Sequence, residues 1–272
     1  MNQTAKSPAS GTENGTDAPL LLRDDKDGIV TLTLNRPDKF NSLSLALLET
    51  LQQTLEDIAD DQSARVVVIA ANGRAFSAGH DLKEIDADPS LEPMKHLMAT
   101  CAKMMQTIVT IPQPVIAKVQ GVATAAGCQL VAQCDLAITA DSVRFGTSGV
   151  NLGLFCSTPM IAVTRNLPRK QAMELLMTGD LIDAPTALSW GLVNKVVPLK
   201  ELDAAVDEMA TKIASKSCAA ISIGKELFYA QINEGLEAAY ELGAEAITCN
   251  LQKEDARNGI KAFLNKQHMP EW

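Results

Sequence analysis

The sequence predicts an α/β protein in which a mixed sheet carries helices and a helical segment closes the chain. Residues 29–34 ("IVTLTL") alternate between apolar and polar positions, as in a strand that is buried on one face. Residues 65–71 ("RVVVIAA") contain a continuous apolar run, typical of a strand buried on both faces. After about Arg165 the remaining patterns are helical. We therefore expect a disordered tail at 1–19, an α/β core at 20–205 and a helical oligomerisation region at 206–272.

The order of the elements follows from the spacing of the apolar residues. Leucines at helical intervals predict a helix from Leu45 to Ile58, for which Ser44 is a suitable N-cap. A methionine-rich helix is expected at 94–111, short strands at 114–121 and 134–140, and a small-residue helix at 124–133 between those strands. Further helical patterns cover 170–180, 184–191, 202–217, 222–232, 236–251 and 255–266.

Composition and charge exclude several classes of protein. The 272 residues carry a formal net charge of −9, which argues against a nucleic-acid-binding protein. Six cysteines without a C-x-x-C pair and three widely separated histidines predict reduced thiols and no metal site. No apolar run is long enough to cross a bilayer, and the first residues have neither a signal core nor a transit pattern, so we expect a cytoplasmic protein.

Two loops of small residues follow predicted strands, at 76–82 ("FSAGHDL") and 119–130 ("VQGVATAAGCQL"). Where such a loop opens a helix, the first backbone N–H groups have no helical partner, and two converging amides would bind an oxyanion. The alternative is that small residues only let a helix pack closely on a strand, and for one loop alone this alternative is favoured. The chain has no G-x-G-x-x-G, P-loop or G-x-S-x-G motif, which disfavours Rossmann, P-loop and α/β-hydrolase enzymes.

Several segments together resemble the enoyl-CoA hydratase/isomerase (crotonase) family. They are "LNRPDKFNSL", "AFSAGHDLKE", "PVIAKVQGVATAAGCQLVAQCDLAITADSVRFG", "NLGL", "MELLMTGDLIDAPTALSWGLVNKVV" and the closing "EGLEAAYELG" and "DARNGIKAFLNK". Their order and spacing match over roughly residues 20–268. The segments "GVNLGLFCSTP" and "LPRK" also resemble one particular group within the family.

The resemblance implies a fold and a ligand. The fold would be a spiral of β-β-α units with a C-terminal helical trimerisation region, giving a homotrimer or a hexamer made of two trimers. The ligand would be an acyl-CoA or enoyl-CoA thioester, so that coenzyme A enters with the substrate and no cofactor or metal is tightly bound. The backbone N–H groups of His80 and Ala126 would form the oxyanion hole. The residues implied to bind substrate or CoA are Lys39, Phe40, Ala78, Gly79, His80, Asp81, Leu82 and Ala126.

Two positions depart from the family pattern. Hydratases of this family carry a catalytic glutamate in the second small-residue loop and another further along the chain, where this sequence has Gln129 and Gly149. Neither residue can exchange a proton, so water addition by paired glutamates is not expected. His80 could replace an acid, although its ring could instead pack or face solvent while only its backbone acts. Cys156 in "FCSTP" could act as a nucleophile, but a buried structural cysteine is the commoner case. Asp81 is expected to stabilise its loop, and Asp135 to be structural.

Three functions follow as hypotheses. The first is an enzyme, a lyase or isomerase of this family, or else a thioester hydrolase, that stabilises an enolate-like oxyanion. The second is a non-catalytic acyl-CoA-binding or regulatory homologue. The third is a peptide hydrolase, for which the sequence offers no assignable Ser-His-Asp set.

Overall fold

The computed structural model describes residues 18–272, so nearly all of the tail expected at 1–19 lies outside the described residues. The main sheet has six strands in the order β1-β2-β3-β5-β7-β10. They are β1 (Leu21–Lys26), β2 (Ile29–Leu34), β3 (Val66–Ala71), β5 (Val115–Val119), β7 (Leu136–Ala140) and β10 (Lys195–Val197). β1 pairs with β2 antiparallel, and all other neighbours in this sheet are parallel.

A second, smaller sheet has the order β4-β6-β8-β9. Its strands are β4 (Ala75–Ser77), β6 (Val122–Thr124), β8 (Arg144–Gly146) and β9 (Ile182–Asp183). The first three are parallel, and β9 pairs antiparallel with β8. Each of these short strands except β9 directly follows a strand of the main sheet in the chain.

The chain therefore repeats a unit of two strands and a helical segment. β3 and β4 lead to α2 (Leu82–Ala87) and α3 (Leu91–Thr110), and β5 and β6 lead to α4 (Ala126–Gln133). β7 and β8 lead to the 3₁₀ helix η2 (Ser148–Leu152) and α5 (Ser157–Asn166). This succession is the predicted spiral of β-β-α units, and it stacks one strand of each sheet per turn.

The helix between the first two parallel strands formed as its sequence predicted. α1 spans Leu45–Ala59, and the side chain of Ser44 accepts a hydrogen bond from the Leu47 amide at its N-terminus. Its buried leucines share the main apolar core with the side chains of β2, β3 and α3. Burial of this face stabilises the helix far more than its intrinsic propensity does.

The prediction of helices alone after Arg165 was wrong at β9 and β10. These strands contain two and three residues, too few to establish an alternating pattern in the sequence. β10 forms because β7, more than fifty residues earlier, offers it a parallel partner. β1 was also missed, although the Asp27-Gly28 pair between β1 and β2 is a typical hairpin turn.

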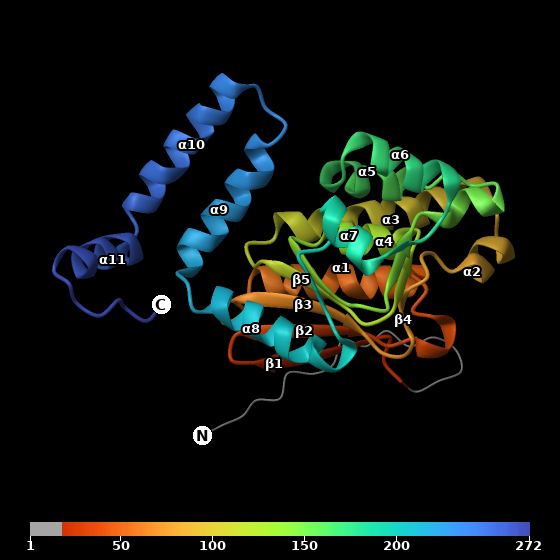
Figure 1. The fold of residues 1–272 in the computed structure, drawn as a ribbon, viewed down its shortest axis with the longest axis horizontal. Coiled ribbons are helices and arrows are strands. Elements are labelled where there is room, and N and C mark those ends of the chain that lie inside the picture. Colours follow the sequence, from red (N-terminus) through yellow and green to blue (C-terminus); the bar gives the residue numbers. More distant parts are fainter. Residues whose placement is uncertain (1–17) are drawn as a thin grey trace.

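The remaining helices divide into two groups. The short helices η1 (Pro37–Lys39), α6 (Arg169–Thr178), α7 (Ala184–Trp190) and η3 (Leu199–Glu201) belong to the body, and α8 (Leu202–Ala214) packs against strands of the main sheet. The C-terminal arm consists of α9 (Cys218–Gln231), α10 (Leu236–Leu251) and α11 (Glu254–Leu264), and it projects away from the body (Figure 1). Within the described residues no helix is both long and apolar enough to span a bilayer.

Candidate functional site

The two small-residue loops leave neighbouring strands of the smaller sheet. The first loop runs from β4 through residues 78–81 into α2, and the second runs from β6 through Ala125 into α4. β4 and β6 are parallel neighbours, so both loops emerge at the same edge of this sheet. The carboxyl ends of parallel strands are where α/β proteins commonly place ligand sites.

Gly79 brings the two loops into contact. Its φ angle of +92° lies in the left-handed region that favours glycine. A Cβ atom at this position would stand 2.9 Å from the Ala125 Cβ and 3.1 Å from the Ala126 nitrogen. The first loop therefore approaches the second as closely as it does only because residue 79 has no side chain.

Gly127 makes a second close approach, between α4 and β4. A Cβ here would stand 2.1 Å from the carbonyl oxygen of Ser77, closer than any real contact allows. The small residues thus do serve close packing of a helix on a strand, which was the alternative explanation for them. The same packing also holds the start of α4 against the first loop, so here the two explanations are compatible.

The backbone amide of His80 has no hydrogen-bond partner within the described chain. Its neighbours are paired across an isolated bridge to Leu43: the Leu43 amide donates to the Gly79 oxygen at 2.8 Å, and the Asp81 amide donates to the Leu43 oxygen at 3.3 Å. In a parallel bridge of this kind the intervening N–H points away from the partner strand. The His80 amide therefore takes no part in the hydrogen bonds of this bridge.

The amide of Ala126 is also without a partner among the described residues. Ala126 is the first residue of α4, where no earlier carbonyl is available within the helix. The preceding residue, Ala125, is held at a φ of +50°, an uncommon angle for a residue with a side chain, and its own amide donates to the Gly146 oxygen at 2.9 Å. This backbone arrangement turns the chain sharply into α4.

A cavity of about 510 Å³ opens beside both loops, within the range usual for small-molecule sites. Of the residues predicted to form the site, five line this cavity: Ala78, His80, Leu82, Ala126 and Gly149. Five others do not line it: Lys39, Phe40, Gly79, Asp81 and Gln129. Phe40 is next to the cavity wall: its carbonyl accepts a hydrogen bond at 3.0 Å from the amide of Ala78, which lines the cavity. The Arg74 guanidinium carbon stands 4.4 Å from the centre of the Phe40 ring.

His80 is the ionisable residue of the first loop that faces the cavity. Its Nε2 atom is buried and has no hydrogen-bond partner in the described chain. Burial lowers the pKa of the imidazole below its ordinary value, so the ring is neutral at pH 7. A neutral ring adds no permanent charge to the site.

Asp81 stabilises the first loop, as the sequence predicted. Its carboxylate accepts from Arg36 at 2.9 Å and from the Ser42 hydroxyl at 3.3 Å, and it caps α2 through the Lys83 amide at 3.2 Å. Burial, the largest single influence, would raise the pKa of Asp81, but the Arg36 guanidinium, the Lys83 amide and the Ser42 hydroxyl together outweigh it, and the pKa is lowered. The aspartate therefore stays ionised and joins the loop to the chain after β2.

The positions of the two family acids are occupied differently. Gln129 is 4% exposed, lies three residues after Ala126 on α4, and has a buried Oε1 without a partner in the described chain. Gly149 has no space for a side chain, because its Cβ would stand 2.7 Å from the Leu154 oxygen and 2.8 Å from the Cys156 sulfur. The segment after η2 thus fills the volume that a side chain at 149 would need.

Most of the apolar lining was not predicted from the sequence. Side chains from α2, α3, the end of η2, the segment after it and the start of α5 complete the cavity wall: Ile85, Met98, Leu152, Leu154, Phe155 and Pro159. Three of these are conspicuously exposed for apolar residues, with Leu152 at 62%, Leu154 at 54% and Phe155 at 46%. The apolar run "NLGLF" with no helical or strand pattern was the only indication of this wall in the sequence.

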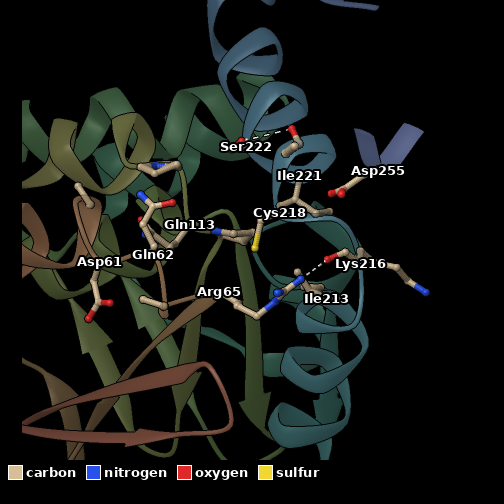
Figure 2. A pocket seen from close by; sticks show the side chains of 15 residues that line it. Asp61, Gln62, Arg65, Gln113, Ile213, Lys216, Cys218, Ile221, Ser222 and Asp255 are labelled. Carbon is tan, nitrogen blue, oxygen red and sulfur yellow. Dashed lines mark hydrogen bonds between the residues drawn. The ribbon is translucent and has the colours of Figure 1, made fainter. Parts of the chain in front are cut away.

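A second cavity, of about 430 Å³, lies at the base of the C-terminal arm. Figure 2 shows Arg65, Gln113, Cys218 and Asp255 around it, and the Arg65 guanidinium donates to the Lys216 carbonyl at 2.6 Å. Its wall combines charged and amide side chains with apolar ones, and both the body and the arm contribute to it. It receives no residue from either small-residue loop, whereas His80 and Ala126 both line the first cavity.

Comparison with known proteins places this geometry in a family. The family model for enoyl-CoA hydratase/isomerase matches residues 24–272. The chain is 45% identical over 254 residues to enoyl-CoA hydratase domain-containing protein 3, mitochondrial, of Xenopus laevis, covering 93% of this chain and 86% of that protein. It is 47% identical over 246 residues to the Homo sapiens protein of the same name, covering 90% and 81% of the two chains. This is the group that "GVNLGLFCSTP" and "LPRK" resembled.

Solved structures agree with these relatives. The crystal structure of an enoyl-CoA hydratase from Mycobacterium smegmatis superposes with a TM-score of 0.92 at 51% identity, covering 94% of this chain and 99% of that one. The crystal structure of human enoyl-CoA hydratase domain-containing protein 3 gives a TM-score of 0.90 at 46% identity, covering 93% and 100%. In sequence and in fold, the chain belongs to the enoyl-CoA hydratase/isomerase family.

Proposed function

We propose that the protein binds an acyl-CoA or enoyl-CoA thioester in the cavity between its two small-residue loops and stabilises an enolate-like oxyanion there. The backbone N–H groups of His80 and Ala126 would donate to the thioester oxygen. The observation that carries this proposal is the pair of unpaired amides on loops held in contact at Gly79. Preorganised donors of this kind stabilise charge that develops in a transition state.

Coenzyme A would enter as part of the substrate, with no resident cofactor or metal. The thioester and acyl groups would occupy the cavity, and the nucleotide part would extend past Lys39 and Phe40. Lys39 supplies a local positive charge to the CoA phosphates, in spite of the net charge of −9 of the whole chain.

A non-catalytic acyl-CoA-binding protein is the second candidate, and the geometry of Gly149 favours it. Because residues 154–156 fill the space beside Gly149, the protein has neither a carboxylate at this position nor room for one. Thioester hydrolysis is a further enzymatic possibility, since it would use the same oxyanion donors. Initial rates on a panel of saturated and unsaturated acyl-CoA esters separate these functions, and calorimetric binding without turnover would identify the binding protein.

Substituting Gly79 by alanine tests the contact between the loops. We expect Gly79→Ala to weaken butyryl-CoA binding, measured by calorimetry, by about tenfold, because the added Cβ separates the two amides that hold the thioester oxygen. Any turnover found in the panel should fall by at least the same factor.

Gly191→Ala is the matched control. Its φ of +89° nearly equals that of Gly79, so both variants carry similar backbone strain, but its Cβ would be 3.5 Å from the Asn166 oxygen, an ordinary contact. Gly191→Ala should retain wild-type affinity. Equal affinities in the two variants would show that the approach of the loops plays no part in binding.

We also propose that the C-terminal arm assembles the protein into trimers. None of the residues of α10 is buried in the isolated chain, and the arm exposes large apolar side chains. They are Phe228, Ile232, Leu236, Tyr240, Ile247, Leu251, Ile260, Phe263 and Leu264. An apolar surface of this extent requires a partner, and further copies of this chain supply one with the same apolar character. Two trimers could then form a hexamer.

Adding charge to the arm should break the assembly. We expect Leu236→Glu combined with Tyr240→Glu to give a monomer in light scattering, since these side chains are 77% and 74% exposed in the isolated chain. Leu199→Glu, which changes an exposed leucine of η3, should leave the oligomer intact. A wild-type monomer, or an oligomer that survives the double change, would refute the role of the arm.

The compartment remains a prediction. All six cysteines lie in the described part of the chain and are free, as expected where thiols are kept reduced. The sequence predicts the cytoplasm, whereas the names of the Xenopus and human relatives place those proteins in mitochondria.

A further inference from the structure

Two consecutive residues between β2 and α1 have left-handed backbone angles. Phe40 and Asn41 each have a φ of +51°, although neither is glycine. Such angles are uncommon for residues with a side chain, and asparagine tolerates them better than phenylalanine does. They persist where the surrounding structure forces them on the chain, and they are concentrated at functional sites. This segment therefore needs specific bonds that hold it in place.

The side chain of Asn41 supplies those bonds. It is completely buried, its Oδ1 accepts from the Arg36 amide at 2.8 Å, and its Nδ2 donates to the carbonyl oxygens of Asn72 and Ala75 at 2.8 Å each. One side chain thus joins the chain after β2 to the connection between β3 and β4 and to the first residue of β4. Aspartate at this position would have no donor for the two carbonyls, and glutamine would be one methylene longer.

The backbone carbonyls of the same two residues bind the first small-residue loop. The Phe40 oxygen accepts from the Ala78 amide at 3.0 Å, and the Asn41 oxygen accepts from the Ser77 hydroxyl at 2.9 Å. The Ser77 hydroxyl in turn accepts from the Gly79 amide at 3.3 Å, and Ser77 is completely buried. The positions of residues 77–79 therefore depend on the conformation of residues 40 and 41.

The His80 amide is the exception in this loop. The Leu43 oxygen accepts from the Asp81 amide at 3.3 Å, so of the amides at 78–81 only that of His80 has no partner in the described chain. Neither Asn41 nor Ser77 lines the cavity, whereas His80 does. An influence of Asn41 on a ligand must therefore pass through the loop.

We propose that Asn41 is a positioning residue of this site. Its side chain holds residues 40 and 41 in the left-handed conformation, and their carbonyls fix the first loop so that the His80 amide is directed at the thioester oxygen. This inference rests on the proposed function, because the His80 amide has a role only if a ligand oxygen occupies the cavity. It makes the donor on the first loop depend on one asparagine in the chain after β2, which never touches the ligand.

A residue that only stabilises the fold would affect every ligand of the cavity equally. A positioning residue for the His80 amide affects only those ligands that have an oxygen for this amide. Butyryl-CoA and S-butyl-CoA form a suitable pair, because the thioether has the same carbon chain and the same CoA but no carbonyl oxygen. The ratio of their dissociation constants therefore measures the backbone donors and is insensitive to a general loss of structure.

Calorimetry of both ligands with the full-length protein tests the proposal. We expect the wild type to bind butyryl-CoA about tenfold more tightly than S-butyl-CoA, as for two hydrogen bonds to a neutral oxygen. Asn41→Gly accommodates the left-handed angle but removes the three side-chain hydrogen bonds. It should reduce the ratio to below about threefold, while S-butyl-CoA binds within about threefold of wild type. Equal weakening of both ligands, or an unchanged ratio, would overturn the positioning role.

Gln113→Ala is the control for the loss of a buried amide. The Gln113 side chain is also buried and donates to a backbone carbonyl, that of Ile58 at 2.8 Å, but it lines the second cavity. This variant should keep the wild-type ratio. A fall of the ratio as large as in Asn41→Gly would show that any buried amide has this effect, and would refute the specific role of Asn41.

Failure of the proposed function gives a different result. A wild-type protein that binds neither ligand, or both with equal affinity, would overturn the oxyanion donors, and the positioning role with them. If Asn41→Gly does not fold, Ser77→Ala replaces it, because this change removes the hydroxyl that joins the Asn41 carbonyl to the Gly79 amide. Ser77→Ala should lower the ratio in the same direction, and a wild-type ratio in this variant would refute the proposal.

Discussion

Replacing Lys225 by methionine is expected to lower the free energy of unfolding by about 3–5 kcal/mol. The ammonium group of Lys225 is buried where α9 meets the body, and it donates to Asp135 at 2.7 Å and to the carbonyls of Ile108 and Gln113 at 2.8 Å each. Burial lowers the pKa of Lys225, and the nearby Asp135 carboxylate opposes this effect. The pair survives burial because each charge compensates the other.

The methionine side chain would leave the Asp135 carboxylate, which is only 15% exposed, without a compensating charge. Its carboxylate would keep only the Tyr229 hydroxyl at 2.8 Å and the Val115 amide at 2.7 Å. Two neutral donors stabilise a buried carboxylate less than an ammonium group does. Since Asp135 belongs to the body and Lys225 to the arm, the variant should also loosen the base of the arm.

Lys118→Met is the matched control for Lys225→Met. Lys118 makes an ion pair of similar length with Asp203, at 2.8 Å, but the Asp203 side chain is 81% exposed. Exposed pairs of this kind contribute at most about 1 kcal/mol. Both variants should be unfolded in urea at the same protein concentration, because assembly makes stability depend on concentration. Losses of equal size would show that burial of the Lys225 pair has no special importance.

Substituting Gly127 by alanine is expected to cost about 3 kcal/mol and to disturb the site at the same time. The added methyl would stand 2.1 Å from the Ser77 oxygen, 2.7 Å from its carbonyl carbon and 2.8 Å from its Cβ. Ser77 is itself completely buried, and its hydroxyl donates to the Asn41 carbonyl at 2.9 Å. Because the obstacle is mainly backbone, the clash cannot be relieved by rotating a side chain, and α4 must move off β4.

Gly224→Ala gives the opposite expectation for the same chemical change. Gly224 lies inside α9, and its Cβ would have no atom within 4 Å. Alanine should therefore stabilise this helix by up to about 1 kcal/mol through its better helix propensity. Thermal unfolding of the two variants beside wild type measures both effects, and a Gly127→Ala protein as stable as wild type would contradict the close approach of α4 to β4.

Local patterns sufficed for those elements whose apolar residues recur at regular intervals. α1 formed where its leucines predicted a helix, with Ser44 as its N-cap, because the spacing of its buried residues and the cap lie within a few residues of chain. Asp135 was expected to be structural, and it joins β7 to the arm. β9 and β10 were not predictable, since two or three residues carry no period and only a distant partner strand makes them strands.

The candidate site was predictable as a pair of loops but not as a cavity. The small residues at 77–79 and 125–127 indicated where backbone amides would be available, and the positions of Gln129 and Gly149 indicated which acids were replaced. The wall formed by Leu152, Leu154 and Phe155 left no periodic pattern in the sequence. Its side chains meet those of α2 and α3 only through the packing of separate repeats of the spiral.

The sequence by itself therefore determined the succession of strands and helices, the membership of the family and the residue types available for chemistry. The tertiary structure alone decided that Gly79 and Ala126 meet, that Gly149 has no room for a side chain, and that His80 and Cys156 share one cavity. The physical reason is the separation along the chain of the residues that interact. Helix caps and apolar periods act over a few residues, whereas these contacts join atoms from different turns of the spiral, and their positions depend on how the whole core packs.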